Sequence, residues 1–170
     1  LGENVLISRN ITIVGPENIS IGNNVRIDDY CLLISPDGGF IKIGNNVHIA
    51  AYCLLSASDG IILADYVGLS HGVKIYSRTD DYSGTFLTNP TVPKKFTGAL
   101  GGTVNICRHS IIGAGSVVMP NLTIEEGASI GALSLVTKNL ESWAIYFGSP
   151  AKKLKKRKKD LLILEIEHKK

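Results

Sequence analysis

A strict six-residue repeat dominates this sequence. From position 106 to 141 an aliphatic residue opens every unit, at Ile106, Ile112, Val118, Ile124, Ile130 and Val136. The fifth place of each unit is mostly small, and the places between carry Gly, charged or amide residues. An α-helix repeats every 3.6 residues and a strand every two, so neither produces a period of six. The repeat predicts a parallel β-helix.

The physical basis of this prediction is the stacking of coils. A solenoid with three flat faces uses about six residues for each face and about eighteen for each coil. Successive coils stack at the spacing of neighbouring strands, roughly 4.8 Å. The aliphatic residue that opens each hexad then points inward, against its equivalents one coil above and one coil below. One coil alone buries almost nothing, so a stable core needs several coils.

Earlier coils show the same repeat, interrupted at regular places. Steps longer than six residues follow Ile13, Leu33, Leu55 and Ile75, and all four fall at the same corner of the triangle. The three short interruptions predict surface bulges, because insertions are tolerated only where they project from the coil. The fourth is the 28-residue loop 76–103. A loop of that length in a compact domain is usually functional.

The repeat stops after Glu141, where the open end of a solenoid must be covered. Three aromatic residues suit such a cap: Trp143, Tyr146 and Phe147. A short helix is expected from Asp160 to His168, with Asp160 as its N-cap. We therefore expect an all-β protein with a β-helix over 1–141, followed by a C-terminal cap and a basic helix over 142–170.

The basic run at 152–159 holds seven of the eighteen Lys and Arg residues, which leaves eleven basic against fifteen acidic residues elsewhere. A solvated helix face is the ordinary interpretation of this run, and a site for the phosphates of a cofactor is the functional one. Nucleic-acid binding would call for an aromatic platform or a recognition motif as well. The sequence shows neither, so we expect no nucleic-acid partner.

No run of eighteen apolar residues is present, so no membrane span is expected. Nothing resembles a secretory signal, although the sequence begins at Leu1 and a leader could precede it. The cysteines, Cys31, Cys53 and Cys107, show no metal or redox spacing, and the first two occupy the small fifth place of their hexads. Buried, unreactive cysteines and the lack of a signal favour a cytoplasmic location.

Stacking converts sequence offsets into columns of side chains. The third residues of five hexads should lie above one another along one corner: Asp29, Ala51, His71, Ala114 and Ala132. His71 then lies one coil from Ala114. The loop 76–103 leaves the coil one hexad later, and it reaches the same region if it folds back or crosses to a neighbouring subunit.

The pattern of [Leu/Ile/Val]-Gly-x-x-[small]-x resembles that of the hexapeptide-repeat acyltransferases over about residues 5–158. This resemblance implies a left-handed parallel β-helix that assembles as a homotrimer, with sites between subunits. It also implies direct transfer of an acetyl group from acetyl-CoA, without a metal. A longer acyl donor stays open.

Two segments resemble the acetyl-CoA site of that family. Gly131-Ala-Leu-Ser-Leu-Val-Thr-Lys138 matches the family pattern Gly-Ala-x-Ser-x-Val-Thr-Lys. By this match Ala114 and Ala132 line the pantetheine arm, and Thr137 and Lys138 lie towards the nucleotide.

The second segment is Gly148-Ser-Pro-Ala-Lys152, which matches the terminal Gly-x-Pro-Ala-Lys of the family. Lys155 matches a basic residue that faces the cofactor phosphates. Because a Lys near a phosphate acts as a point charge, Lys152, Lys153 and Lys155 are expected to substitute partly for one another.

If the arm runs from Lys138 past Ala132 and Ala114, its thioester arrives near His71. Transfer to a hydroxyl calls for a base, and imidazole has a suitable pKa. We therefore expect His71 to be catalytic. Many members of this family carry their catalytic His inside the extended loop, whereas the loop here has none.

The loop supplies the candidates for substrate binding: Asp80, Asp81, Tyr82, Ser83 and Asn89. Either carboxylate is suited to orient His71 or to bind a sugar hydroxyl or an ammonium group, although adjacent carboxylates on loops are also commonly solvated or used in turns. Asp-Asp-Tyr-Ser-Gly followed by Asn-Pro-x-Val-Pro resembles a subgroup that acts on sugars of bacterial surface polysaccharides.

The main prediction is therefore O-acetylation of a sugar in bacterial surface polysaccharide (O-antigen or capsule) synthesis. One alternative is N-acetylation of a nucleotide-linked amino sugar, and another is a non-catalytic β-helix scaffold. An essential His71 favours the hydroxyl acceptor, whereas a dispensable His71 with an essential Asp80 or Asp81 favours the amine. A metal enzyme like the γ-class carbonic anhydrases is disfavoured, because His48, His71 and His109 lack the close pair that supplies two ligands.

Overall fold

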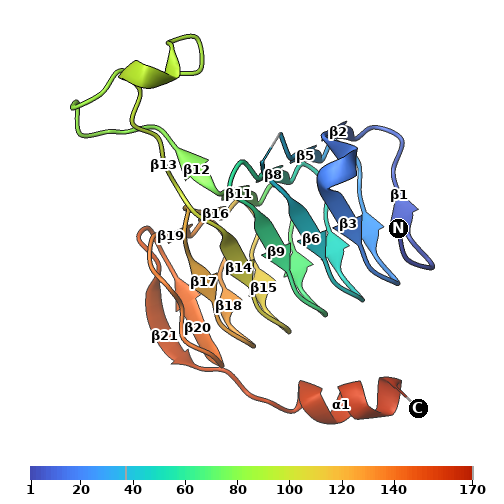
Figure 1. The fold of residues 1–170 in the computed structure, drawn as a ribbon. Coiled ribbons are helices and arrows are strands. Elements are labelled where there is room, and N and C mark those ends of the chain that lie inside the picture. The colour runs from blue at the N-terminus through green and yellow to red at the C-terminus, as the bar shows by residue number, and fades with distance from the viewer. Residues whose placement is uncertain (37, 170) are drawn as a thin grey trace.

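The chain folds into a left-handed β-helix of triangular cross-section, from which one long loop projects (Figure 1). The computed structural model describes residues 1–36 and 38–169. The first face of the triangle carries an eight-stranded sheet in the order β1 (Leu6–Ile7), β4 (Arg26–Ile27), β7 (His48–Ile49), β10 (Gly68–Leu69), β15 (Ile111–Ile112), β18 (Ser129–Ile130), β20 (Ala144–Phe147) and β21 (Lys152–Lys156).

Two shorter sheets form the other faces. The second sheet contains β2 (Thr12–Val14), β5 (Leu32–Ile34), β8 (Leu54–Ser56), β11 (Lys74–Tyr76), β16 (Val117–Val118) and β19 (Leu135–Val136). The third contains β3 (Ile19–Ile21), β6 (Ile41–Ile43), β9 (Ile61–Leu63), β14 (Val104–Ile106) and β17 (Thr123–Ile124). A short 3-10 turn, Pro16–Asn18, precedes β3.

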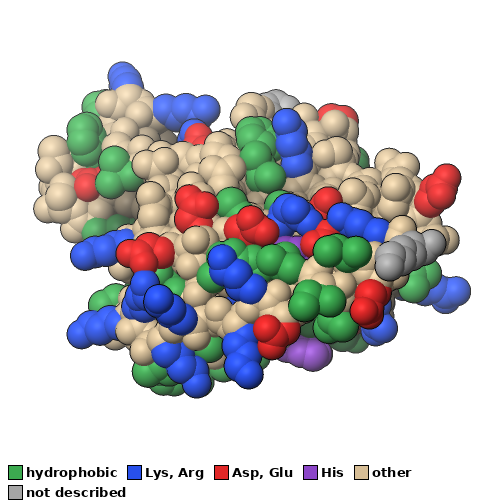
Figure 2. Space-filling view, turned by 90° about the horizontal axis from the view of Figure 1, so that it is seen from below, with side chains coloured by type: hydrophobic (Ala, Val, Ile, Leu, Met, Phe, Trp, Pro, Cys, Tyr) green, Lys and Arg blue, Asp and Glu red, His purple; other side chains and the backbone are tan. Residues whose placement is uncertain are grey.

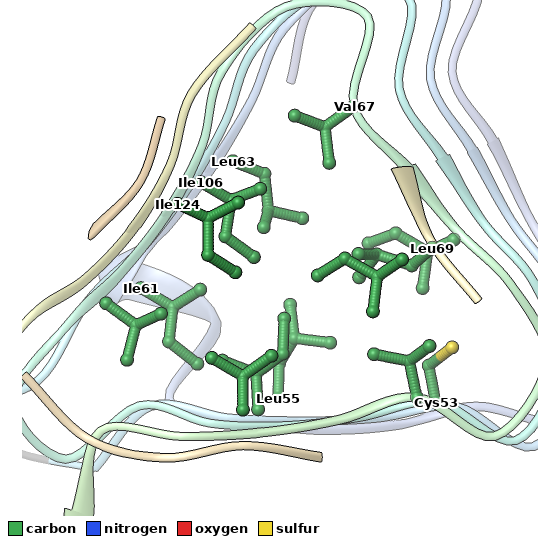
Figure 3. Packing of buried hydrophobic residues seen from close by; sticks show 14 of the residues in the cluster. Cys53, Leu55, Ile61, Leu63, Val67, Leu69, Ile106 and Ile124 are labelled. Carbon is green, nitrogen blue, oxygen red and sulfur yellow. The ribbon is translucent and has the colours of Figure 1, made fainter. Parts of the chain in front are cut away.

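The inward stacking of the hexad openers is confirmed. Leu63, Ile106 and Ile124 pair in parallel register across β9, β14 and β17. Figure 3 shows these three side chains stacked on one wall of the triangular core, facing Leu69 and Leu55 from the other two walls. All five are at most 1% exposed. The parallel strands are short because each coil must turn again after two or three residues, so burial of the stacked aliphatic columns stabilises the fold.

The interruptions of the repeat do lie at one corner, between the second and third sheets. The loop 76–103 begins with a two-stranded antiparallel stem, β12 (Arg78–Thr79) with β13 (Leu100–Gly101), and carries a 3-10 turn at Lys94–Phe96. Arg78 in the stem forms an ion pair with Asp59 of the preceding coil. Figure 1 shows the loop, coloured light green, extending away from the coil.

The C-terminal segment covers the end of the solenoid with a hairpin. β20 adds to the first sheet beside β18, and β21 pairs antiparallel with β20. Tyr146 fills the core column above Ile130 and is buried, whereas Phe147 is exposed. Trp143 packs on Gly127, where a Cβ atom would lie 2.6 Å from the indole ring. Two of the three aromatic residues therefore act as predicted, and Phe147 lies on the outer surface.

The short helix expected from Asp160 to His168 is confirmed as α1 (Leu161–His168), but the expectation that this helix is basic, and the interpretation of the basic run as a helix face, were wrong. The basic run supplies the edge strand β21, and α1 begins only after it, in an apolar and acidic stretch. The run is extended because β20 presents an open edge that needs a hydrogen-bonding partner, and lysines on the new edge discourage further pairing. Asp160 does occupy the N-cap position of α1, but its side chain forms no cap hydrogen bond.

A partly buried cluster of charged and polar side chains holds α1 against the coil. Glu165 accepts hydrogen bonds from Arg108 (2.5 Å) and Lys169 (2.6 Å), and one of its carboxylate oxygens lies 2.9 Å from Nε2 of His109. His109 is buried and stacks on Tyr66 with a centroid separation of 5.1 Å. The hydrogen bond from Lys169, followed by that from His109 and by the charge of Arg108, lowers the pKa of Glu165 to about 2.

We expect α1 to detach in acid. A carboxylate with a lowered pKa stabilises the docked state above its ordinary pKa of 4.5 and loses that contribution as the pH falls towards 2. Fluorescence of the single Trp143, whose ring lies 6.3 Å from that of His109, should therefore change between pH 4.5 and 2. The variant Glu165→Gln should show the acid-state signal already at pH 7, whereas Glu167→Gln should behave as wild type. An unchanged acid transition in Glu165→Gln would contradict this role.

Candidate functional site

The predicted corner column is present. The backbone N–H of Gly115 donates to the carbonyl of His71 at 2.9 Å, and that of Leu133 donates to the carbonyl of Ala114 at 2.8 Å. These bonds link successive coils, so His71, Ala114 and Ala132 follow one another along the corner between the first and second sheets. All three side chains are exposed. The two alanines place only methyl groups in this column on the C-terminal side of His71.

His71 lines a shallow pocket of about 200 Å³ on the outer face of the first sheet. The pocket also contains His48, Ser70 and Ile111. Within the described part of the chain, no residue forms a hydrogen bond with the His71 ring, so both ring nitrogens are available to a ligand. His48, in contrast, is held by Asp28, with 2.9 Å between Nε2 and Oδ2.

Sequence reasoning missed His48 and Ser70 as lining residues. His48 lies on the outward column of the first sheet, in register with Gly68. Ser70 is the residue immediately after β10. The hexad rule assigned both to places of no special role, and only the pairing of β7 with β10 shows that they share a pocket with His71.

The two adjacent carboxylates of the loop differ in their hydrogen bonds. Asp81 accepts from the backbone N–H of Ser83 (3.0 Å), its hydroxyl (2.7 Å) and the N–H of Phe86 (3.3 Å). The bonds from Ser83 lower the pKa of Asp81. Asp80 accepts one weak bond, from the N–H of Asn89 at 3.3 Å. Asp81 is therefore used to fold the loop, and Asp80 retains acceptor capacity for a ligand.

The other loop candidates point to solvent or into turns. Tyr82 is 88% exposed. The Asn89 side chain accepts from the backbone N–H and hydroxyl of Thr91, and its backbone takes a left-handed conformation with φ of 73°. None of the loop candidates is among the lining residues of the His71 pocket. Within one chain, the described structure thus leaves the loop and the pocket separate.

The segment Gly148-Ser-Pro-Ala151 folds onto the last coil. Gly148 donates its N–H to Oγ of Ser134 at 3.1 Å and accepts from the N–H of Leu135 at 3.0 Å. Ala151 donates to the carbonyl of Leu135 at 2.8 Å. Phe147, just before this segment, covers Gly131, where a Cβ atom would lie 2.4 Å from the phenyl ring. These contacts place an exposed aromatic ring and a basic strand beside Ala132.

A bulge in β21 sorts its lysines onto two faces. The register with β20 shifts between Ile145 and Tyr146, so Lys155 lies opposite Ile145 and Lys152 lies opposite Phe147. Because paired residues in a sheet point to the same side, Lys152 and Lys155 share the outer face. Lys153 lies opposite the buried Tyr146 and pairs with Glu141 at 2.5 Å. Lys153 is therefore not equivalent to the other two, contrary to the expectation.

Basic side chains surround this end of the molecule. Figure 2 shows Lys and Arg gathered at its left end, where Figure 1 places β20 and β21. Thr137 and Lys138, which follow β19, are both exposed. The small corner residues, the exposed Phe147 ring and the cations form a surface suited to an extended pantetheine arm and an anionic nucleotide.

The structure offers no metal centre within residues 1–36 and 38–169, where no three His, Cys, Asp or Glu side chains cluster closely enough to hold an ion. Two of the three histidines considered for such a centre have carboxylate partners of their own, Asp28 for His48 and Glu165 for His109. The same described residues contain no helix with the length and apolar character that crossing a membrane demands.

Comparisons with known proteins agree with this description. The chain is 46% identical over 165 residues to the dTDP-4-amino-4,6-dideoxy-D-glucose acyltransferase of Escherichia coli, a match that covers 97% of this chain and 85% of that protein. No protein-family model matches the chain.

Solved structures give the same result. A variant of AntD, an N-acyltransferase from Bacillus cereus, in complex with dTDP-4-amino-4,6-dideoxyglucose and coenzyme A superposes with a TM-score of 0.94 at 42% identity, covering 98% of this chain and 88% of AntD. AntD in complex with dTDP and 3-hydroxybutyryl-CoA gives a TM-score of 0.93 at 40% identity, covering 99% and 88%. The chain therefore belongs to the family of the dTDP-4-amino-4,6-dideoxy-D-glucose acyltransferase and is a left-handed β-helix acyltransferase that uses acyl-CoA.

Proposed function

We propose that the protein transfers an acyl group from acyl-CoA to the amino group of a dTDP-linked amino sugar. The observation that carries this proposal is the similarity, over almost the whole chain, to two enzymes whose names state this acceptor or N-acyl transfer. The same observation favours the amine alternative over the hydroxyl acceptor of the main sequence prediction. A role in surface polysaccharide synthesis stays a prediction.

The transfer needs no covalent intermediate with the enzyme. The sugar ammonium loses one proton to solvent, and the neutral nitrogen attacks the thioester carbonyl. A carbon–nitrogen bond forms, the carbon–sulfur bond breaks, and the second proton of the nitrogen passes to the departing thiolate of CoA. A deprotonated amine is a good nucleophile, so the protein mainly has to align it with the thioester.

In this proposal the site residues have the roles that the family resemblance implies, supported by the corner column and the basic strand. The pantetheine arm lies along Ala132 and Ala114, with its phosphates near Lys152 and Lys155 and its thioester at His71. Asp80 binds the ammonium of the sugar, since it is the loop carboxylate with acceptor capacity left. Thr137 and Lys138 flank the nucleotide of CoA, and Tyr82, Ser83 and Asn89 flank the sugar nucleotide.

A homotrimer brings the loop of one subunit to the His71 pocket of the next. One outward row of the second sheet supports a subunit interface on that face, because most of its members are apolar: Leu32, Leu54, Val117 and Leu135. Lys74 of β11 interrupts this row between Leu54 and Val117. On a sheet face that remains exposed to water, such a row of outward side chains is usually polar or charged. Sedimentation of the full chain should give a mass three times that of the monomer, and a monomer that is active would contradict the shared site.

CoA release with matched acceptors tests the proposed function. With butyryl-CoA or acetyl-CoA, dTDP-4-amino-4,6-dideoxyglucose should release CoA, and dTDP-glucose, which offers only hydroxyls, should release at least 100-fold less. The product should survive alkaline hydroxylamine, because this reagent cleaves oxygen esters and leaves amides intact. CoA release with dTDP-glucose but not with the amino sugar, together with a product that hydroxylamine cleaves, would support O-acylation instead.

A further inference from the structure

Gly68 leaves a notch in the outer face of the first sheet. It pairs with His48 on one side and with Ile111 on the other. A Cβ atom at Gly68 would meet a single neighbour, Cγ1 of Ile111, at an ordinary 3.8 Å. Glycine weakens a strand interior, and here neither the backbone conformation nor close packing demands it. The absence of a side chain at this position therefore indicates a role in binding rather than in folding.

The notch joins two hollows of the surface. On one side is the pocket of about 200 Å³ that contains His71, and on the other is a larger one of about 370 Å³ beneath α1. Gly68 and Ile111 line both. A continuous groove thus leads from His71, across Gly68, to the underside of the helix.

The larger hollow is chiefly apolar, with Ile111, Leu161 and Leu164 among its lining residues. Ile111 and Leu164 remain 42% and 63% exposed. On the face shown in Figure 2, apolar side chains lie beside the helix. Removing the apolar surface of an exposed side chain from water is favourable, and an alkyl chain lying in the groove would cover these side chains.

Two charged groups at the rim, Arg157 and Glu165, already have partners. Arg157 donates to the carbonyls of His109 (2.7 Å) and Gly127 (3.1 Å). Glu165 is held by the cations described above. Phosphate or sugar binding in this hollow would have to break these bonds, whereas an alkyl chain would leave them intact.

We propose that this groove receives the alkyl part of an acyl group longer than acetyl, and that Gly68 sets the length that is accepted. The inference rests on the proposed function in one respect, that the thioester lies at His71. Chains of four to six carbons would pass over Gly68 and lie on Ile111 and Leu164. A side chain at position 68 would close the passage.

Calorimetric binding of acetyl-, butyryl- and hexanoyl-CoA to the full chain tests this without any acceptor. Each buried methylene tightens binding about fourfold, so wild type should bind butyryl-CoA, which has two more methylenes, about 15-fold more tightly than acetyl-CoA, and hexanoyl-CoA more tightly still. The Gly68→Val variant should bind all three acyl-CoA donors with equal affinity. Ser20→Val, a matched change at an outward strand position of the third sheet, should keep the wild-type order.

The result is independent of the sugar reaction. The protein could fail to acylate any amino sugar while wild type keeps the order of donor affinities and Gly68→Val loses it. That result would overturn the proposed acceptor and support the role of the groove. Equal affinities for the three donors in wild type, or an unchanged order in a folded Gly68→Val, would overturn the groove. Because a Cβ at position 68 has room, Gly68→Ala should melt no lower than wild type and should show an intermediate order.

Discussion

Asp80→Asn should lower kcat/KM for a dTDP-linked amino sugar about 100-fold, because a hydrogen bond between charged groups contributes about 1.5–3 kcal/mol. The proposed mechanism uses the negative charge of Asp80 to bind the sugar ammonium. Asn keeps an oxygen that can accept from the N–H of Asn89, so the loop should stay folded. The loss should appear with saturating acyl-CoA and in KM for the sugar, measured by CoA release.

Two control variants separate this effect from damage to the loop. Asp81→Asn removes the charge of the neighbour, whose three bonds lie within the turn, and should change kcat/KM less than fivefold. His71→Ala should lower kcat less than tenfold with an amine acceptor, since alignment rather than proton removal dominates. An active Asp80→Asn together with an inactive His71→Ala would contradict the account and return His71 to the role of an essential base.

The double variant Lys152→Ala, Lys155→Ala should raise KM for acyl-CoA about 30-fold, with kcat little changed. Each exposed cation contributes up to about 1 kcal/mol to an ion pair, or roughly fivefold, and the bulge in β21 puts both on one face. The effect should shrink as ionic strength rises, because salt screens exposed charges. Steady-state kinetics at low and high salt measure both quantities.

Lys153→Ala is the matched control for charge. It removes the same charge from the same strand, but Lys153 pairs with Glu141 on the other face, so KM for acyl-CoA should change less than twofold. An equal rise of KM in Lys153→Ala would show that only the total charge of the run matters, and that the sorting of lysines by the bulge is irrelevant to CoA.

The sequence was sufficient for the repetitive part of the molecule. The six-residue period identifies the residue that points inward in each coil, so the stack that includes Leu63 and Ile106 was predictable. The corner column of His71 and Ala114 could be predicted from the same period. Insertions at one corner were predictable for the same reason, since a parallel ladder tolerates them only outside its strands.

Features that depend on contacts between unrelated segments were not predictable. The hydrogen bond between His109 and Glu165 joins positions 56 residues apart that share no repeat. The basic run reads equally well as a helix or a strand, and only the open edge of β20 decides between them. The difference between Asp80 and Asp81 comes from the turn at Ser83, which composition does not reveal.

The most direct measurement is a crystal structure of the protein with CoA and dTDP-4-amino-4,6-dideoxyglucose bound. The account predicts pantetheine along Ala132 and Ala114, phosphates at Lys152 and Lys155, and the thiol beside His71. The sugar nitrogen should lie roughly 3–3.5 Å from the position of the thioester carbon, within hydrogen-bond reach of Asp80 from a neighbouring subunit. A CoA bound away from this corner, or a sugar whose amino group points away from the thiol, would contradict the account.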